Sequence, residues 1–221
     1  MRSVRLFFTK EGLTRYISHL DLMRCFSRAI KRAKIDIWYT EGYNPRPYMN
    51  FSLPLNLGTE SLCETLDIRT NDEMPFDEIK CRLNSVLPEG IKITACAAPV
   101  HKAEEICFAD YEISFDCSDA EKALKYISER LEGEEILVEK KAKQGRKRVL
   151  RQINIRENIK SYELTQNEKV LKLSMNVCAG MKNNTNITLL VDALTKEIKD
   201  SVESVRVVKR KMYTQDMKEF V

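Results

Sequence analysis

The chain has 221 residues, of which 43% are hydrophobic and 32% are charged, and its formal net charge is +4. This length suits one large domain or two small ones, and the apolar content favours a packed core over wholesale disorder. No run of about 18 apolar residues occurs, so we expect no membrane span and no membrane partner. The alternation of polar and apolar residues over positions 1–10 likewise predicts no signal peptide.

The first half of the chain has the hydrophobic spacing of a β-α-β-β-α-β order. Apolar patterning predicts four strands, at residues 4–9, 35–39, 62–70 and 91–97. Ser18 is a good N-cap for the first helix, and Leu22 and Phe26 recur at helical spacing on its buried face. Pro75 begins the second helix, and an extended segment at 51–57 precedes the third strand.

The second half repeats this order of elements more loosely. The predicted strands are 108–115, 136–140, 161–165, 170–177 and 205–213, and the predicted helices begin at Ser118 and cover 187–198. The two strands at 161–177 form a hairpin that turns at 166–168. We therefore predict an α+β protein of tandem ferredoxin-like (βαββαβ) halves with antiparallel sheets, an N-terminal domain at 1–100 and a C-terminal domain at 105–221.

The cysteine and histidine content argues against a metal site. The seven cysteines include no C-x-x-C pair, which zinc sites and iron–sulfur clusters usually contain. The two histidines exclude a site with three or more His ligands. We therefore predict that the chain binds no metal, and that its thiols are reduced and mostly buried, as in a cytoplasmic protein. No glycine-rich phosphate-binding motif occurs either.

Positive charge is unevenly distributed along the chain. Residues 1–50 contain ten Lys and Arg against four Asp and Glu, residues 51–135 are acidic, and residues 140–160 are basic again. A basic face favours polyanions, whereas the alternative is an ordinary solvated surface. Arg24 and Arg28 lie on the polar face of the first predicted helix and belong to this basic surface.

The segment from Arg15 to Asp21 connects the first predicted strand to the first predicted helix and includes the start of that helix. Backbone N–H groups at a helix start point toward an anion, and Arg15 and His19 add side-chain donors. His19 is also a candidate general acid or base near neutral pH. The alternative is a histidine that only hydrogen-bonds locally.

The loop at 41–48 is stiffened by two prolines, at positions 45 and 47. A stiff loop holds Tyr43, Asn44, Arg46 and Tyr48 in place with little loss of entropy on binding. Aromatic rings beside an arginine suit stacking on bases combined with phosphate contacts. The alternative is a rigid turn that only joins two strands.

A third basic segment, at 140–151, contains Lys147 and Arg148 but no aromatic residue. It offers charge without stacking, so salt-dependent, non-specific phosphate binding is its natural function. A mobile, solvated loop is the equal alternative.

Several stretches of the first sixty residues together match a long family motif. They are R-Y-I-S-H-L-D-L-M-R at 15–24, Phe26, R-A at 28–29, Y-T-E-G-Y-N-P-R-P at 39–47, F-S-L-P-L at 51–55 and Gly58. In these residues the chain resembles the radical-SAM-linked (radical-SAM-associated) bacterial proteins, a family of unknown function. The resemblance implies an accessory role beside a radical SAM enzyme that has a cobalamin-binding region. This chain lacks a C-x-x-x-C-x-x-C run. S-adenosylmethionine, an iron–sulfur cluster and cobalamin are therefore implied only on that partner.

Three functions remain open from the sequence, and it does not decide whether the chain is an enzyme. The first is a non-catalytic module that binds RNA or presents substrate to a radical SAM enzyme. The second is a metal-independent endoribonuclease with His19 as general acid or base, assisted by Tyr16 or Tyr43. It is suggested because two ferredoxin-like halves with an N-terminal histidine are similar to the CRISPR RNA-processing endoribonucleases. The third is a protein-interaction domain that docks on its radical SAM partner through the apolar and acidic middle of the chain.

Overall fold

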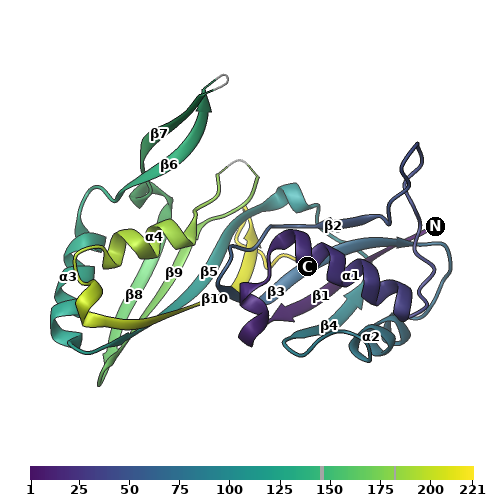
Figure 1. Ribbon diagram of the computed structural model, residues 1–221, viewed down its shortest axis with the longest axis horizontal. Coiled ribbons are helices and arrows are strands. Elements are labelled where there is room, and N and C mark those ends of the chain that lie inside the picture. Colours follow the sequence, from purple (N-terminus) through teal and green to yellow (C-terminus); the bar gives the residue numbers. More distant parts are fainter. Residues whose placement is uncertain (145–146, 182) are drawn as a thin grey trace. The chain divides into compact units, whose positions relative to one another are not determined.

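A computed structural model describes residues 1–144, 147–181 and 183–221; for 141–149 it describes no side chains. The chain divides into two units, Met1–Cys107 with Val208–Val221, and Phe108–Val207 (Figure 1). The junction at Cys107 lies just beyond residue 105, where the C-terminal domain was predicted to begin. The last segment of the chain, however, returns to the first unit, whereas the predicted domains ran consecutively along the sequence.

The first unit combines an antiparallel sheet with two helices. Its elements are β1 (Arg2–Lys10), α1 (His19–Arg32), β2 (Met49–Phe51), β3 (Thr59–Thr70), α2 (Phe76–Asn84), β4 (Ile91–Ala97) and the C-terminal part of β10 (Val202–Thr214). The strand order is β4-β1-β3-β10, and β2 pairs with β3. The pairings of β1 with β3, β1 with β4 and β2 with β3 are all antiparallel.

Both helices of the first unit pack on the same face of its sheet. Leu6 and Phe8 of β1 lie on the same face of the sheet, because every second side chain of a strand points to one face. Both belong to the buried cluster that includes Phe26 of α1. Ile79 and Leu83 of α2 complete the same buried cluster. This core leaves the opposite face of α1 exposed, which is the face that carries its arginines.

The strand predicted at 35–39 does not form. After α1, Lys34 adopts a left-handed conformation with φ of 53°, and the following segment makes only isolated bridges, Ile37 to Thr70 and Tyr39 to Pro47. The prediction was wrong because β2 pairs with β3 in its place, through Met49 opposite Ile68.

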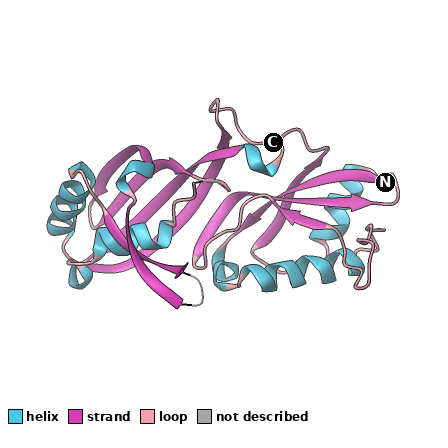
Figure 2. Cartoon of the chain, turned by 90° about the horizontal axis from the view of Figure 1, so that it is seen from above, coloured by secondary structure: helices cyan, strands magenta, loops and turns pink. Residues whose placement is uncertain are grey.

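The second unit is also a mixed α+β structure with antiparallel pairing. Its elements are β5 (Ile106–Cys117), α3 (Ala120–Glu132), β6 (Leu137–Gln144), β7 (Lys147–Asn154), β8 (Ile159–Asn167), β9 (Val170–Cys178), α4 (Ile187–Thr195) and the N-terminal part of β10. The strand order is β10-β5-β9-β8, and β6 with β7 forms a separate two-stranded sheet. Figure 2 distinguishes these helices and strands by colour. Short 3-10 helices cover Gly12–Tyr16 (η1), Ala103–Glu105 (η2), Arg156–Asn158 (η3) and Lys199–Ser201 (η4).

Two local predictions for the second unit need correction. The N-cap of α3 is Asp119, whose carboxylate accepts a hydrogen bond from the Lys122 N–H at 3.1 Å, because the hydroxyl of Ser118 instead donates to the Asp200 carbonyl. The basic segment at 140–151 is part of the β6–β7 hairpin rather than a loop, with Lys140 opposite Arg151. Its centre, at 145–146, lies outside the described residues.

The longest helix, α1, has 14 residues. In the described parts of the chain, no helix has both the length and the hydropathy needed to cross a membrane.

Candidate anion-binding site

The positive charge at the N-terminal end of α1 is neutralised by a carboxylate of the helix itself. The Ser18 hydroxyl accepts a hydrogen bond from the Asp21 N–H at 3.2 Å and donates one to the Asp21 carboxylate at 2.7 Å. Asp21 also forms an ion pair with Arg24 at 3.1 Å. The hydrogen bonds from Ser18 and then Arg24 lower the pKa of the Asp21 carboxyl. The positive end of the helix therefore already holds a carboxylate.

Arg15 is engaged within the protein. Its Nη1 lies 3.0 Å from a carboxylate oxygen of the buried Glu60, and its Nη2 donates to the Tyr16 hydroxyl at 2.8 Å. The guanidinium carbon also lies 4.8 Å from the centre of the Tyr16 ring. The Tyr16 hydrogen bond first, and then Glu60, raise the pKa of Arg15. Arg15 is thus a fixed cation with part of its donor capacity used.

Buried charges lie beneath this region. Lys209 of β10 forms an ion pair with Glu64 of β3 at 2.6 Å, and neither side chain is more than 3% exposed. Lys10 is buried nearby and donates to the Arg15 carbonyl at 3.3 Å. Burial lowers the pKa of Lys10, against the opposing field of Glu64. These groups hold the end of the sheet together and cannot reach an external polyanion.

His19 packs as an aromatic ring. It lies 5.1 Å from the Phe51 ring in an edge-to-face arrangement, and its side chain is half-buried. Among the described residues, the His19 ring forms no hydrogen bond or ion pair. Tyr16 bonds to Arg15 instead of His19. The part of the chain that the structure describes therefore supplies no partner for acid–base catalysis at His19.

The proline-containing loop is closed by backbone pairing. The Thr40 N–H donates to the Arg46 carbonyl at 2.8 Å, and the Arg46 N–H donates back to the Thr40 hydroxyl at 3.1 Å. Tyr43 and Asn44, at the tip, are exposed. Tyr48 is half-buried, and the Arg69 guanidinium carbon lies 4.3 Å from the centre of its ring. Of the two loop tyrosines, Tyr43 is the one left open for stacking.

Three of the predicted cations lie together. Arg24 and Arg28 of α1 and Arg46 of the loop line one groove of about 270 Å³, whose lining also includes Met23 and Met49. A second hollow of about 410 Å³, also lined by Arg24 and Arg28, borders the same helix. In the described part of the chain, the side chains of Arg28 and Arg46 form no hydrogen bond or ion pair. We call these two hollows, with the three arginines, the α1 groove.

The helical repeat explains this placement. Arg24 and Arg28 are four residues apart, so they lie on one face of α1, while Leu22 and Phe26 turn into the core. Like charges at this spacing destabilise an isolated helix slightly, and an anionic ligand between them would offset that repulsion.

The remaining predicted cations, Lys147 and Arg148, belong to β7 in the second unit. Their side chains lie outside the part that the structure describes. Sequence reasoning also missed a cavity in this unit lined by Arg130 and Lys196. The sequence feature that could have indicated this cavity is Arg130, a charged residue next to Leu131 on the apolar side of a predicted helix. Among the described residues, no cluster of His, Cys, Asp and Glu could hold a metal ion.

Fold and groove together define a mixed α+β protein with a mostly antiparallel sheet and an arginine-lined groove on its first helix. The family described as "Uncharacterized protein conserved in bacteria (DUF2344)" matches residues 3–188. The chain therefore belongs to this family. No curated protein matches the chain.

Two solved structures are similar to the chain at low identity. A chain of a Cbf5–Nop10–Gar1 complex is 9% identical with a TM-score of 0.49, over 95% of this chain and 48% of that one. The present chain thus spans about half the length of that relative. An unknown protein from Galdieria sulphuraria is 10% identical with a TM-score of 0.27, over 94% of this chain and 98% of that one. Both TM-scores are below 0.5, so neither likeness bears on function.

Proposed function

We propose that the first unit binds RNA at the α1 groove, as a non-catalytic accessory module that presents RNA to a radical SAM enzyme. The observation that carries the RNA-binding part is the convergence of Arg24, Arg28 and Arg46 on one groove. Two of these three guanidinium groups have no partner among the described residues.

Arginine suits this role because its planar fork of donors matches a phosphate group. The groove is lined in part by the apolar side chains of Met23 and Met49, but by no aromatic residue. Recognition there would thus rest on the phosphate backbone and would be largely independent of base sequence. Tyr43, fully exposed at the loop tip, would add stacking on one base.

The proposal of a radical SAM partner rests on the sequence motif at 15–24 and 39–47. Arg24 and Arg46, two residues of that motif, are also residues of the α1 groove. The same proposal places the protein in the cytoplasm, in keeping with its seven free cysteines. We also propose the finer fold assignment of tandem ferredoxin-like halves. The order β4-β1-β3, with β2 on the far side of β3, supports that assignment for the first unit.

The RNA interaction is tested by fluorescence anisotropy with a labelled single-stranded RNA. We expect the double variant Arg28→Gln/Arg46→Gln to bind at least roughly tenfold more weakly than wild type, because two charge-assisted contacts are lost. The matched control is Arg82→Gln/Lys92→Gln, which removes the same charge from two positions of the same unit that do not line the groove, the half-buried Arg82 and the exposed Lys92. Equal weakening in both double variants would contradict a specific groove.

The partner is tested separately by co-purification. Capture of a radical SAM protein from the source organism, in nuclease-treated lysate, supports the accessory role. If the radical SAM protein is captured from untreated lysate but not from nuclease-treated lysate, the association runs through RNA, and direct docking is excluded.

A further inference from the structure

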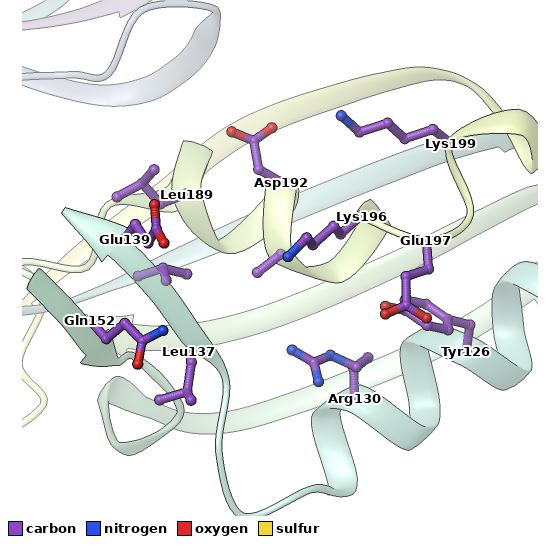
Figure 3. A pocket seen from close by; sticks show the side chains of 12 residues that line it. Tyr126, Arg130, Leu137, Glu139, Gln152, Leu189, Asp192, Lys196, Glu197 and Lys199 are labelled. Atoms are coloured by element: carbon purple, nitrogen blue, oxygen red, sulfur yellow. The ribbon is translucent and has the colours of Figure 1, made fainter. Parts of the chain in front are cut away.

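The second unit contains a cavity of about 580 Å³. It lies between α3, the base of the β6–β7 hairpin, α4 and the residues that follow α4 (Figure 3). This volume falls within the range of about 300–1,000 Å³ that is usual for small-molecule sites. All of its lining residues belong to the second unit, so this site is separate from the α1 groove.

The lining carries balanced charge. Its cations are Arg130, Lys196 and Lys199, and its carboxylates are Glu139, Asp192 and Glu197. None of these six side chains forms an ion pair or a hydrogen bond within the described residues. Five of these six residues are exposed to solvent, and only Arg130 is partly buried. Groups of both signs around one cavity complement a ligand that itself carries charge of both signs.

Two of the cations face the open space. Figure 3 shows the guanidinium of Arg130 and the ammonium of Lys196 pointing into the open space from opposite sides, with the Gln152 amide across from them. The Nε of Arg130 is buried and has no hydrogen-bond partner in the described structure. A buried donor without a partner is rare in folded proteins. A ligand in the cavity would meet the terminal guanidinium nitrogens of Arg130, which face the open space, and not its Nε.

The carboxylates restrict the ligand. Glu139 and Gln152 are cross-strand neighbours at the base of the hairpin, and Asp192 lies on α4 beside the same cavity. The three carboxylates offset the three cations, so the lining gives a polyanion no net attraction, and RNA is a poor occupant here. Leu137 and Leu189 supply apolar surface between the charged groups.

We propose that this cavity binds a small zwitterion of the amino-acid type. Arg130 and Lys196 hold its carboxylate, Glu139 and Asp192 face its ammonium group, and the two leucines contact its side chain. The proposal does not depend on RNA binding, because it uses other residues in the other unit.

The test is isothermal titration calorimetry of the full chain with the standard amino acids, each up to about 10 mM, beyond the millimolar limit of weak specific binding. For leucine, the matched half-molecules are 4-methylpentanoate, which lacks the amine, and 3-methylbutylamine, which lacks the carboxylate. We expect at least one amino acid to bind, and its two half-molecules to bind at least about tenfold more weakly. Absence of binding by every amino acid, or equal binding of a half-molecule, would overturn the proposal.

Variants locate the binding. Lys196 is exposed, so Lys196→Gln should fold normally, and Arg130→Gln tests the partly buried donor. Each should weaken binding about tenfold, because a charge-assisted hydrogen bond is lost. The control Lys172→Gln, exposed on β9 and outside the cavity lining, should bind as wild type does. If Lys196→Gln binds with wild-type affinity, the proposed carboxylate site is wrong, and this result holds even if Arg130→Gln fails to fold.

Discussion

At the scale of single residues, the chain separates cations that hold the fold from cations that are available to a ligand. Arg5 is fully buried, forms an ion pair with Asp67 at 2.7 Å, and donates to the His101 carbonyl at 2.8 Å. Arg28 and Arg46 are exposed and line the α1 groove. The difference is burial, since a buried guanidinium must satisfy its donors inside the protein.

Gly90 is a residue that the fold requires. Its φ is +87°, and an added Cβ would lie 2.5 Å from the Glu11 carbonyl oxygen. We expect Gly90→Ala to lower the free energy of unfolding by about 2 kcal/mol or more, because strain and a backbone clash add together. Gly58 has a similar φ of +81° but open space around it, so Gly58→Ala should cost less. Urea unfolding measures both, and equal losses would argue against the close contact.

Two partly buried thiols predict a pH dependence of stability. Burial raises the pKa of Cys63 and of Cys96 to about 11. Unfolded cysteines ionise near about pH 8.5, so this stabilisation is complete below that pH and is lost as pH rises through about 11. Lys10, whose pKa is lowered, contributes with the opposite sign, and therefore the comparison uses a variant.

In urea unfolding between about pH 8 and 11, wild type should lose more stability than Cys63→Ala/Cys96→Ala, because the variant lacks the two titrating thiols. Both proteins contain Lys10, so its contribution cancels. Identical pH profiles would contradict the raised thiol pKa values.

At the scale of elements, β10 is fixed to the first unit by a buried ion pair. Lys209→Met leaves the Glu64 carboxylate buried without its partner, which should cost about 3–5 kcal/mol of unfolding free energy. Lys211 of the same strand pairs with Glu219, and both side chains are about half exposed. Lys211→Met should therefore cost less than about 1 kcal/mol. Chemical denaturation of the two variants gives the comparison, and a small loss for Lys209→Met would show that Glu64 is not held as described.

Most elements follow from local sequence, and the exceptions have tertiary causes. The spacing of Leu22 and Phe26 and the cap at Ser18 predict α1 correctly. The missing strand at 35–39 depends on competition with β2 for the edge of β3, which no local pattern reveals. The site behaves in the same way. Arg24 and Arg28 share a face by helical spacing, but the pairing of Arg15 with Glu60, 45 residues away, depends on strand register.

At the scale of the whole molecule, the family match over residues 3–188 covers most of both units. The first unit carries the arginine-lined α1 groove, and the second carries a cavity with charges of both signs. This division predicts that a polyanion and a small zwitterion bind independently. Saturating the chain with a bound amino acid should leave its RNA affinity unchanged, as measured by anisotropy.

The salt dependence of RNA binding tests the central claim most directly. Each phosphate contact with single-stranded RNA contributes about 0.7 to the slope of log K against log salt concentration. Wild type and Arg28→Gln/Arg46→Gln should therefore differ in slope by about 1.4, whereas Arg82→Gln/Lys92→Gln should keep the wild-type slope. Equal slopes for wild type and the groove variant would contradict phosphate binding by the α1 groove.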